Sequence, residues 1–209
     1  MRILPSLSLA AALVILPLSA GATTIFTDGL NAATNVGLAV TTTVGNFNVV
    51  SPTNVDLLGG GTFGFLCTPT TSQCVDLNGS GANSSGIIQS NILFAPGTYL
   101  LSFDLTGSGR GNTTSTLVTF GNFSQTFTLA SGDLTTGNIV NQLVTLTSSG
   151  FLTFTDENGN GSNVGSILDT ASVSTNASPI PEPSSLILLG SGMLTSLGFV
   201  ARRRKQTIG

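Results

Sequence analysis

The chain contains no histidine and no tryptophan among its 209 residues, and only 7% of its residues are charged. Histidine is the most frequent metal ligand and general base near neutral pH, so its absence excludes the commonest zinc sites and catalytic triads. No G-x-S-x-G motif occurs, and Glu157 is the only glutamate between residues 23 and 178. No spacing singles out a pair of carboxylates of the kind that glycosidases use. We therefore expect no catalytic residues and a protein that is not an enzyme.

Positive charge is also scarce. Residues 23–178 contain eight acidic side chains and one basic side chain, Arg110, which gives this region a net charge of −7. Nucleic acids and anionic membranes both require a basic surface, so neither is an expected partner. Two roles are open for Arg110: an ion pair with Asp104 or another acid, or a bidentate contact with the hydroxyl groups of a sugar.

The chain has only two cysteines, Cys67 and Cys74, with six residues between them. This spacing differs from the C-x-x-C motif of redox-active thiols, and no histidine or further cysteine is available to complete a metal site. In an exported protein such a pair most simply forms one local disulfide. A loop of this size stabilises a fold by about 2–3 kcal/mol.

The N-terminus has the features of a secretory signal peptide. Arg2 precedes an apolar run over residues 7–18, and Ala20-Gly21-Ala22 forms a small-x-small cleavage site. The apolar run is too short to span a membrane convincingly. We predict that residues 1–22 are removed by signal peptidase and that residues 23–178 fold in an oxidising compartment.

The Gly-, Ser-, Thr- and Asn-rich composition of residues 23–178 is compatible with disorder, but its apolar residues alternate with polar ones. In residues 99–105 the odd positions are apolar, and similar patterns occur at 117–120, 123–129 and 151–154. Gly-, Asn- and Pro-rich turn signals separate these runs. We predict ten to twelve short strands in an all-β, antiparallel β-sandwich whose core contains most of the eleven Phe residues and the single Tyr.

A calcium-binding loop is one interpretation of residues 156–161. Asp156, Asn158 and Asn160 occupy alternate positions of a D-x-N-x-N-G sequence, as calcium ligands do in EF-hand loops. The twelfth position is Ile167, where such a loop requires a bidentate Glu. The alternative is a polar hairpin turn, because Asn and Gly tolerate positive φ.

The last thirty residues combine three features in a fixed order. Residues 179–183 hold alternating prolines and the motif Pro181, Glu182 and Pro183, which favours an extended backbone that a protease can bind. Residues 184–201 contain no charge and predict one transmembrane helix about 27 Å long. Residues 202–209 form a basic cytoplasmic tail that begins with Arg202, Arg203, Arg204 and Lys205. A plain single-pass anchor with a proline-rich stalk is the alternative.

This order of motif, apolar span and basic stop resembles the C-terminal sorting signal of PEP-CTERM proteins. That resemblance implies processing by a membrane protease of the exosortase type, in Gram-negative bacteria that make exopolysaccharide. It further implies an inner-membrane intermediate, cleavage near Pro181-Glu182-Pro183, and delivery to the cell surface or the extracellular matrix.

Four segments of the exported region, residues 75–80, 96–103, 109–111 and 164–169, resemble a galactose-binding-like jelly roll. This resemblance implies a jelly-roll sandwich and carbohydrate contact through its end loops. Two functions are therefore expected: a structural or interaction protein of the cell surface or biofilm matrix or, as the alternative, a carbohydrate-binding module for exopolysaccharide.

Overall fold

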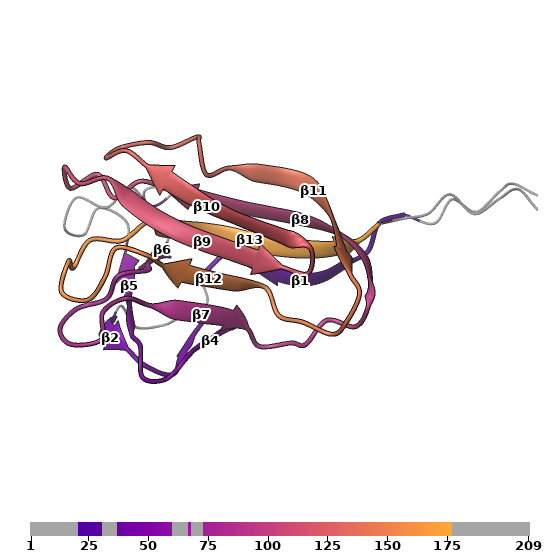
Figure 1. The fold of residues 1–209 in the computed structure, drawn as a ribbon, viewed down its shortest axis with the longest axis horizontal. Helices are drawn as coiled ribbons and strands as arrows, with labels where there is room; N and C mark the ends of the chain where they lie inside the picture. The colour runs from indigo at the N-terminus through magenta and orange to yellow at the C-terminus, as the bar shows by residue number, and fades with distance from the viewer. Residues whose placement is uncertain (1–20, 31–36, 60–66, 68–72, 177–209) are drawn as a thin grey trace, which may run out of the picture. The chain divides into compact units, whose positions relative to one another are not determined.

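Two antiparallel sheets pack face to face in the computed structural model, which describes residues 21–30, 37–59, 67 and 73–176 (Figure 1). Within these ranges every regular element is a strand, so the predicted all-β class is confirmed. The strands are β1 (Thr24–Asp28), β2 (Gly37–Val40), β3 (Thr43–Val44), β4 (Phe47–Val49), β5 (Val55–Gly59), β6 (Gln73–Asp76), β7 (Ile87–Ser90), β8 (Gly97–Thr106), β9 (Thr114–Phe120), β10 (Phe123–Leu129), β11 (Ile139–Leu146), β12 (Thr153–Asp156) and β13 (Ile167–Thr175).

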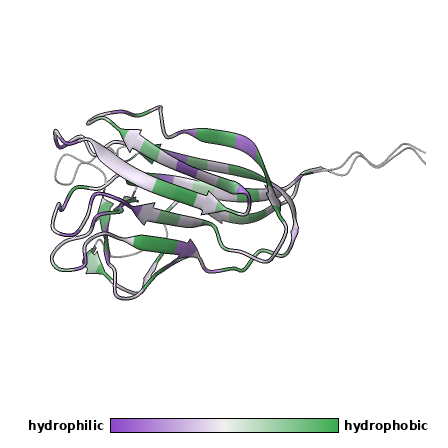
Figure 2. Cartoon of the chain, in the orientation of Figure 1, coloured by the Kyte–Doolittle hydropathy of each residue, from purple (hydrophilic) through white to green (hydrophobic). Residues whose placement is uncertain are grey.

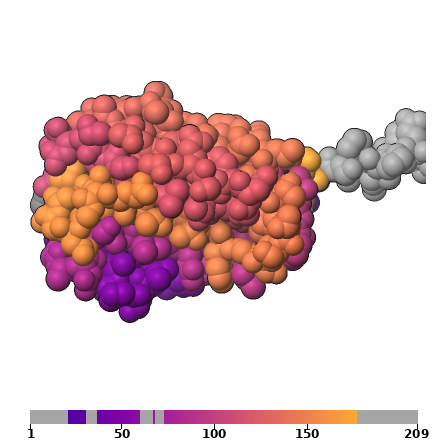
Figure 3. Space-filling model, viewed as in Figure 1, coloured from indigo at the N-terminus to yellow at the C-terminus, as the bar shows by residue number. Residues whose placement is uncertain are grey.

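The seven-stranded sheet has the order β11-β8-β13-β6-β5-β2, and β1 pairs with the C-terminal half of β13. The six-stranded sheet has the order β10-β9-β12-β7-β4-β3. Figure 3 views the molecule from the side of the six-stranded sheet, where the orange segment around β12 lies between the rose and purple segments of the neighbouring strands. All strand pairs are antiparallel, as the sequence pattern predicts for a sandwich.

The predicted two-residue alternation is confirmed in the long central strands. In β8 Tyr99, Leu101, Phe103 and Leu105 are buried, whereas the residues between them are half-buried. The same alternation appears in β9, and green and purple bands succeed one another along the strands in Figure 2. One face of each strand thus contributes to the space between the sheets, where the burial of apolar surface drives folding.

Edge-to-face aromatic contacts fill this space. Phe103 of β8 meets Phe154 of β12 across the sandwich at 5.3 Å between ring centroids, and Phe154 meets Phe47 of β4 at 5.8 Å. Phe47 in turn contacts Phe26 of β1 at 5.2 Å. Because β1 and β8 belong to one sheet and β4 and β12 to the other, these rings join the two sheets.

The described chain ends lie side by side. The backbone N–H of Thr175 donates to the carbonyl of Thr23 at 2.8 Å, and the N–H of Thr23 donates to Thr175 Oγ1 at 3.0 Å. The loops at residues 77–86, 107–113 and 157–166 gather at the opposite end of the sandwich (Figure 1). The compact unit that contains this core spans Ala22–Asn176.

Several predicted features lie outside the described residues. They are nearly all of the signal peptide (1–20), the Pro-rich motif (179–183), the transmembrane helix (184–201) and the basic tail (202–209). Within the residues that the structure describes, no helix has the length and hydrophobicity needed to cross a bilayer.

Candidate functional site

The outer face of the seven-stranded sheet divides into two halves with different chemistry. Over β5, β6 and the first part of β13, Leu58, Cys67, Cys74 and Ile167 form a small buried cluster that is separate from the main core. Over the remainder of β13 and over β8, the outward side chains are mostly Ser, Thr and Asp, whereas β1 and β11 add the exposed Ile25, Val140 and Leu143. The first half is therefore closed by apolar contacts, and the second is the open surface.

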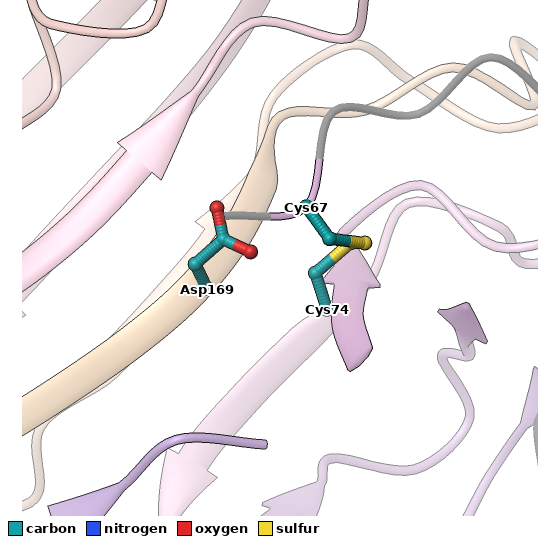
Figure 4. A group of neighbouring side chains, drawn as sticks. All are labelled: Cys67, Cys74 and Asp169. Carbon is teal, nitrogen blue, oxygen red and sulfur yellow. A yellow bond between two sulfur atoms is a disulfide. The ribbon is translucent and has the colours of Figure 1, made fainter. Parts of the chain in front are cut away.

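A disulfide between Cys67 and Cys74 confirms the predicted bridge. Asp169 lies beside it on β13 (Figure 4). The two Sγ atoms and one carboxylate oxygen of Asp169 all lie within 4.8 Å of one another. Asp169 is the extra residue of a β-bulge, since Leu168 pairs with Leu105 and Thr170 pairs with Asp104. Because both sulfur atoms are in the disulfide, the oxidised cluster is a covalent clamp and not a thiolate metal site.

The open half contains a groove of about 350 Å³ that crosses four neighbouring strands. Its lining consists of Thr27, Asp28, Gly29, Ser102, Phe103, Asp104, Asn138, Ile139, Val140, Thr170, Ala171 and Ser172. None of these residues carries a positive charge. Seven of the twelve lining residues have hydroxyl, carboxyl or amide side chains, but apolar atoms make up most of the exposed surface of the lining. A mainly apolar wall with a few polar groups that orient the ligand is typical of small-molecule sites.

Asp104 is a half-buried carboxyl in the lining of this groove. Its Oδ1 atom is buried and has no hydrogen-bond partner within the described part of the chain. Burial raises the pKa of this carboxyl above its ordinary value. Asp28 also lines the groove, but its two oxygens already accept hydrogen bonds from the backbone N–H groups of Leu30 and Asn46. Oδ1 itself is covered by protein atoms, so a ligand donor would reach Asp104 through its other carboxylate oxygen.

A β-bulge in β11 shapes the rim of the groove. Ile139 pairs with Phe103 and Gln142 pairs with Leu101, so β11 has one more residue here than β8. The bulge residue Asn141 has a φ of 52°. The preceding residue, Val140, is 76% exposed, so an apolar group lies at the edge of the groove.

The loop at residues 156–161 is tied to its neighbours by the side chains that the calcium hypothesis requires as ligands. Asn158 Oδ1 accepts a hydrogen bond from the N–H of Ser115 at 2.8 Å. Asn160 Oδ1 accepts one from the N–H of Ser85 at 3.0 Å. The hydrogen bonds favour the polar-turn alternative, and calcium at this loop stays a prediction.

Asp156, the first residue of that loop, is buried at the end of β12. Its Oδ2 atom accepts a hydrogen bond from Asn78 Nδ2 at 2.7 Å, and the same amide group donates to the carbonyl of Gly159 at 2.9 Å. Burial raises the pKa of Asp156, while hydrogen bonds from Asn78, Asn158 and Ser85 act in the opposite direction. Asn78 therefore closes the loop onto the β6–β7 connection.

Asp76 is a second buried carboxyl at this end of the sandwich. Its Oδ1 atom accepts hydrogen bonds from the N–H groups of Asn78 and Gly165, at 2.9 Å and 2.8 Å. Its Oδ2 atom is buried without a partner among the described residues. Burial, with a smaller contribution from the charges of Asp56 and Asp156, raises the pKa of Asp76 to about 7. Asp56 lies directly opposite Asp76 in the β5–β6 pair.

Arg110 lies in the loop between β8 and β9 and is exposed. Its Nη1 atom donates a hydrogen bond to the carbonyl of Asn163 in the β12–β13 loop at 2.6 Å. The side chain thus joins two loops at one end of the sandwich. Arg110 is not part of the groove lining, so the structure does not bring it together with Asp104 at that site.

The sequence prediction missed the groove residues. The outward position of Ser102 and Asp104 follows from the alternation in residues 99–105, but nothing local indicates which strands lie beside them. Thr170 and Ser172 come from β13, nearly seventy residues later in the chain. The only available signal was the unusual number of hydroxyl and carboxyl groups on the outward faces of these two strands.

The described residues thus define an all-β sandwich, and the chain continues from it into the tail segment that carries the Pro-Glu-Pro motif. Residues 179–205 match the family model for the PEP-CTERM protein-sorting motif. This match supports the predicted sorting signal, and the motif marks the chain for export with processing by exosortase, a membrane protease. No curated protein shows significant similarity to the sequence.

Proposed function

We propose that this protein is a structural or interaction component of the cell surface or biofilm matrix, with the β-sandwich as the part that functions after export. The observation that carries the proposal is the position of the sorting motif. The motif begins at residue 179, and the sandwich ends at Asn176, so little else lies between the sorting signal and the folded domain.

The proposed route has two cleavages. Signal peptidase removes residues 1–22, which leaves Thr23 at the new N-terminus; its N–H already bonds to Thr175 in the folded domain. A transmembrane helix at residues 184–201, with Arg202–Lys205 on the cytoplasmic side, then holds an inner-membrane intermediate of a Gram-negative bacterium. An exosortase-type protease cleaves near Pro181-Glu182-Pro183 and passes the domain outward.

Two properties of the domain support a lasting role outside the cell. The Cys67–Cys74 disulfide is buried, and such bridges persist in oxidising compartments. The exported region has low charge and a single basic residue, which limits attraction to anionic surfaces. We propose a role in binding or scaffolding and none in catalysis.

The finer fold assignment, a galactose-binding-like jelly roll, belongs to the same proposal. From β7 to β13 the chain passes repeatedly from one sheet to the other, and only β9 and β10 are consecutive neighbours in one sheet. Such crossing connections characterise jelly rolls and other Greek-key sandwiches. This connectivity supports the assignment.

A carbohydrate-binding module for exopolysaccharide is the second candidate function. The groove on the seven-stranded sheet favours it, because hydroxyl, amide and carboxyl side chains without any positive charge suit a neutral ligand rich in hydroxyl groups. Matrix proteins can combine both functions, since weak contacts repeated along a polymer give high avidity.

The first candidate is tested by localisation in the producing organism. A chain in which Pro181, Glu182 and Pro183 are replaced by alanine is compared with the unchanged protein after separation of inner membrane, outer surface and matrix. We expect the unchanged sandwich at the surface or in the matrix and the variant in the inner membrane. Equal retention of both proteins in the inner membrane would contradict the proposal and favour a plain anchor.

A further inference from the structure

The groove over β11, β8, β13 and β1 is an open concavity in the described residues, and the chemistry of its lining indicates a class of ligand. It is built on a rigid part of the fold. β8 and β13 are the longest two strands and pair along eight register positions, and β11 and β1 flank them. Side chains on such strands are held in fixed directions, which favours a preformed site.

The polar groups of the groove can both donate and accept hydrogen bonds. Ser102 Oγ accepts the N–H of Asn141 at 2.9 Å, so its own proton is available to a ligand. The hydroxyl groups of Thr170 and Ser172 lie beside it on β13. Thr170 pairs with Asp104 and Ser172 pairs with Ser102, so hydroxyl donors and a carboxylate acceptor lie side by side, as a ligand with several hydroxyl groups requires.

The charge of the groove selects among polar ligands. Asp104 is negative when ionised and no lining residue is positive, so phosphate, sulfate and uronate groups would be repelled. The half-buried Ile139 and the exposed Val140 provide an apolar edge on which the C–H face of a pyranose ring can pack. A peptide is less well served, because β8 and β13 are interior strands whose backbone groups are already paired.

We propose that this groove is a binding site for an uncharged, hydroxyl-rich saccharide, with the Asp104 carboxylate as the principal acceptor of sugar hydroxyl protons. This inference rests on the second candidate function and makes it more specific. It places the contact on the face of the seven-stranded sheet, and not on the end loops that contain Arg110 and residues 156–161.

The test uses the oxidised unit Ala22–Asn176 and two probes: exopolysaccharide purified from the producing organism, and alginate as a polyanionic glycan. Two variants alter the groove. Thr170→Tyr fills it from an exposed strand position, and Asp104→Ala removes the acceptor. The matched control is Thr126→Tyr, which makes the same change at an exposed position of β10 on the other sheet.

We expect saturable binding of the exopolysaccharide and none of alginate. Asp104→Ala should weaken binding about tenfold, the effect of losing one hydrogen bond to a charged group. Thr170→Tyr should abolish binding, and Thr126→Tyr should leave it unchanged. Thermal unfolding of each variant checks that it folds, and chemical-shift mapping by NMR should place the perturbed amides on β8, β13 and β11.

Each other outcome is decisive. Binding that all three variants retain would overturn the groove assignment while leaving a carbohydrate function elsewhere on the domain. Equal binding of alginate would overturn the requirement for an uncharged ligand. An absence of any binding by the unchanged protein would overturn the carbohydrate function together with this inference, and the structural role would remain.

Discussion

Asp76 predicts an unusual dependence of stability on pH. Its carboxyl is fully buried, one of its oxygens has no partner among the described residues, and its pKa is raised to about 7 from 3.8. Between pH 4 and pH 7 the folded protein therefore holds a proton that the unfolded chain has released. Because the folded state binds more protons, the free energy of unfolding must fall as pH rises through this window.

The size of this effect follows from the shift. One pKa unit corresponds to about 1.4 kcal/mol, so a rise from 3.8 to about 7 weakens the fold by about 4 kcal/mol between pH 4 and pH 8. That loss is a large part of the stability of a typical domain. The pKa values of Asp28, Asp104 and Asp156 are also raised, so their contributions have the same sign.

The assay is urea unfolding of the oxidised unit Ala22–Asn176 at intervals from pH 4 to pH 8, for the unchanged protein and for Asp76→Asn. The unchanged protein should lose stability as pH rises, and the variant should lose about 4 kcal/mol less. Asp133→Asn is the matched control. Hydrogen bonds from Thr136 and Thr135 lower the pKa of Asp133 to about 2, so its stabilising effect is complete above pH 4. Parallel profiles for the unchanged protein and Asp76→Asn would refute the reasoning.

Three further predictions concern the loops and the disulfide. Replacing both Cys67 and Cys74 by serine should lower the free energy of unfolding by about 2–3 kcal/mol, measured by urea unfolding. An unchanged free energy of unfolding would show that the disulfide does not stabilise the fold. Gly86→Ala should be strongly destabilising, because a Cβ atom would lie 2.4 Å from the carbonyl oxygen of Leu77. Gly81 has open space around it, so Gly81→Ala should cost only the strain of its positive φ. Similar thermal unfolding of the two variants would contradict this packing. EDTA should leave thermal unfolding unchanged, since Asn158 and Asn160 already accept hydrogen bonds from backbone N–H groups. Stabilisation by added calcium would instead support the calcium hypothesis for residues 156–161.

The fold class and the disulfide could be predicted from the sequence because both depend on short-range patterns. The alternation in residues 99–105 repeats every two residues, and only a strand with one buried face has this period. Cys67 and Cys74 lie close enough in the chain to meet with little loss of chain entropy. The structure has thirteen strands in its described part, more than the ten to twelve predicted, because β3 and β4 contain only two and three residues.

The groove could not be predicted because it depends on the neighbours of each strand. Asp104 and Thr170 lie opposite each other only because β13 inserts between β8 and β1 in the sheet. The bulges at Asn141 and Asp169 add a further uncertainty, because one extra residue changes the face on which the following side chains lie. Neither bulge contains a glycine that would have indicated it.

The most direct test of the account is the intact mass of this protein isolated from the producing organism, compared between cells with and without the exosortase. The proposed route predicts that the mature chain begins at Thr23 and ends near Pro181-Glu182-Pro183 in the normal cells, and that residues 184–209 are retained when the protease is absent. A mature chain that still includes residues 184–209 in normal cells would contradict it and would identify the tail as a permanent anchor.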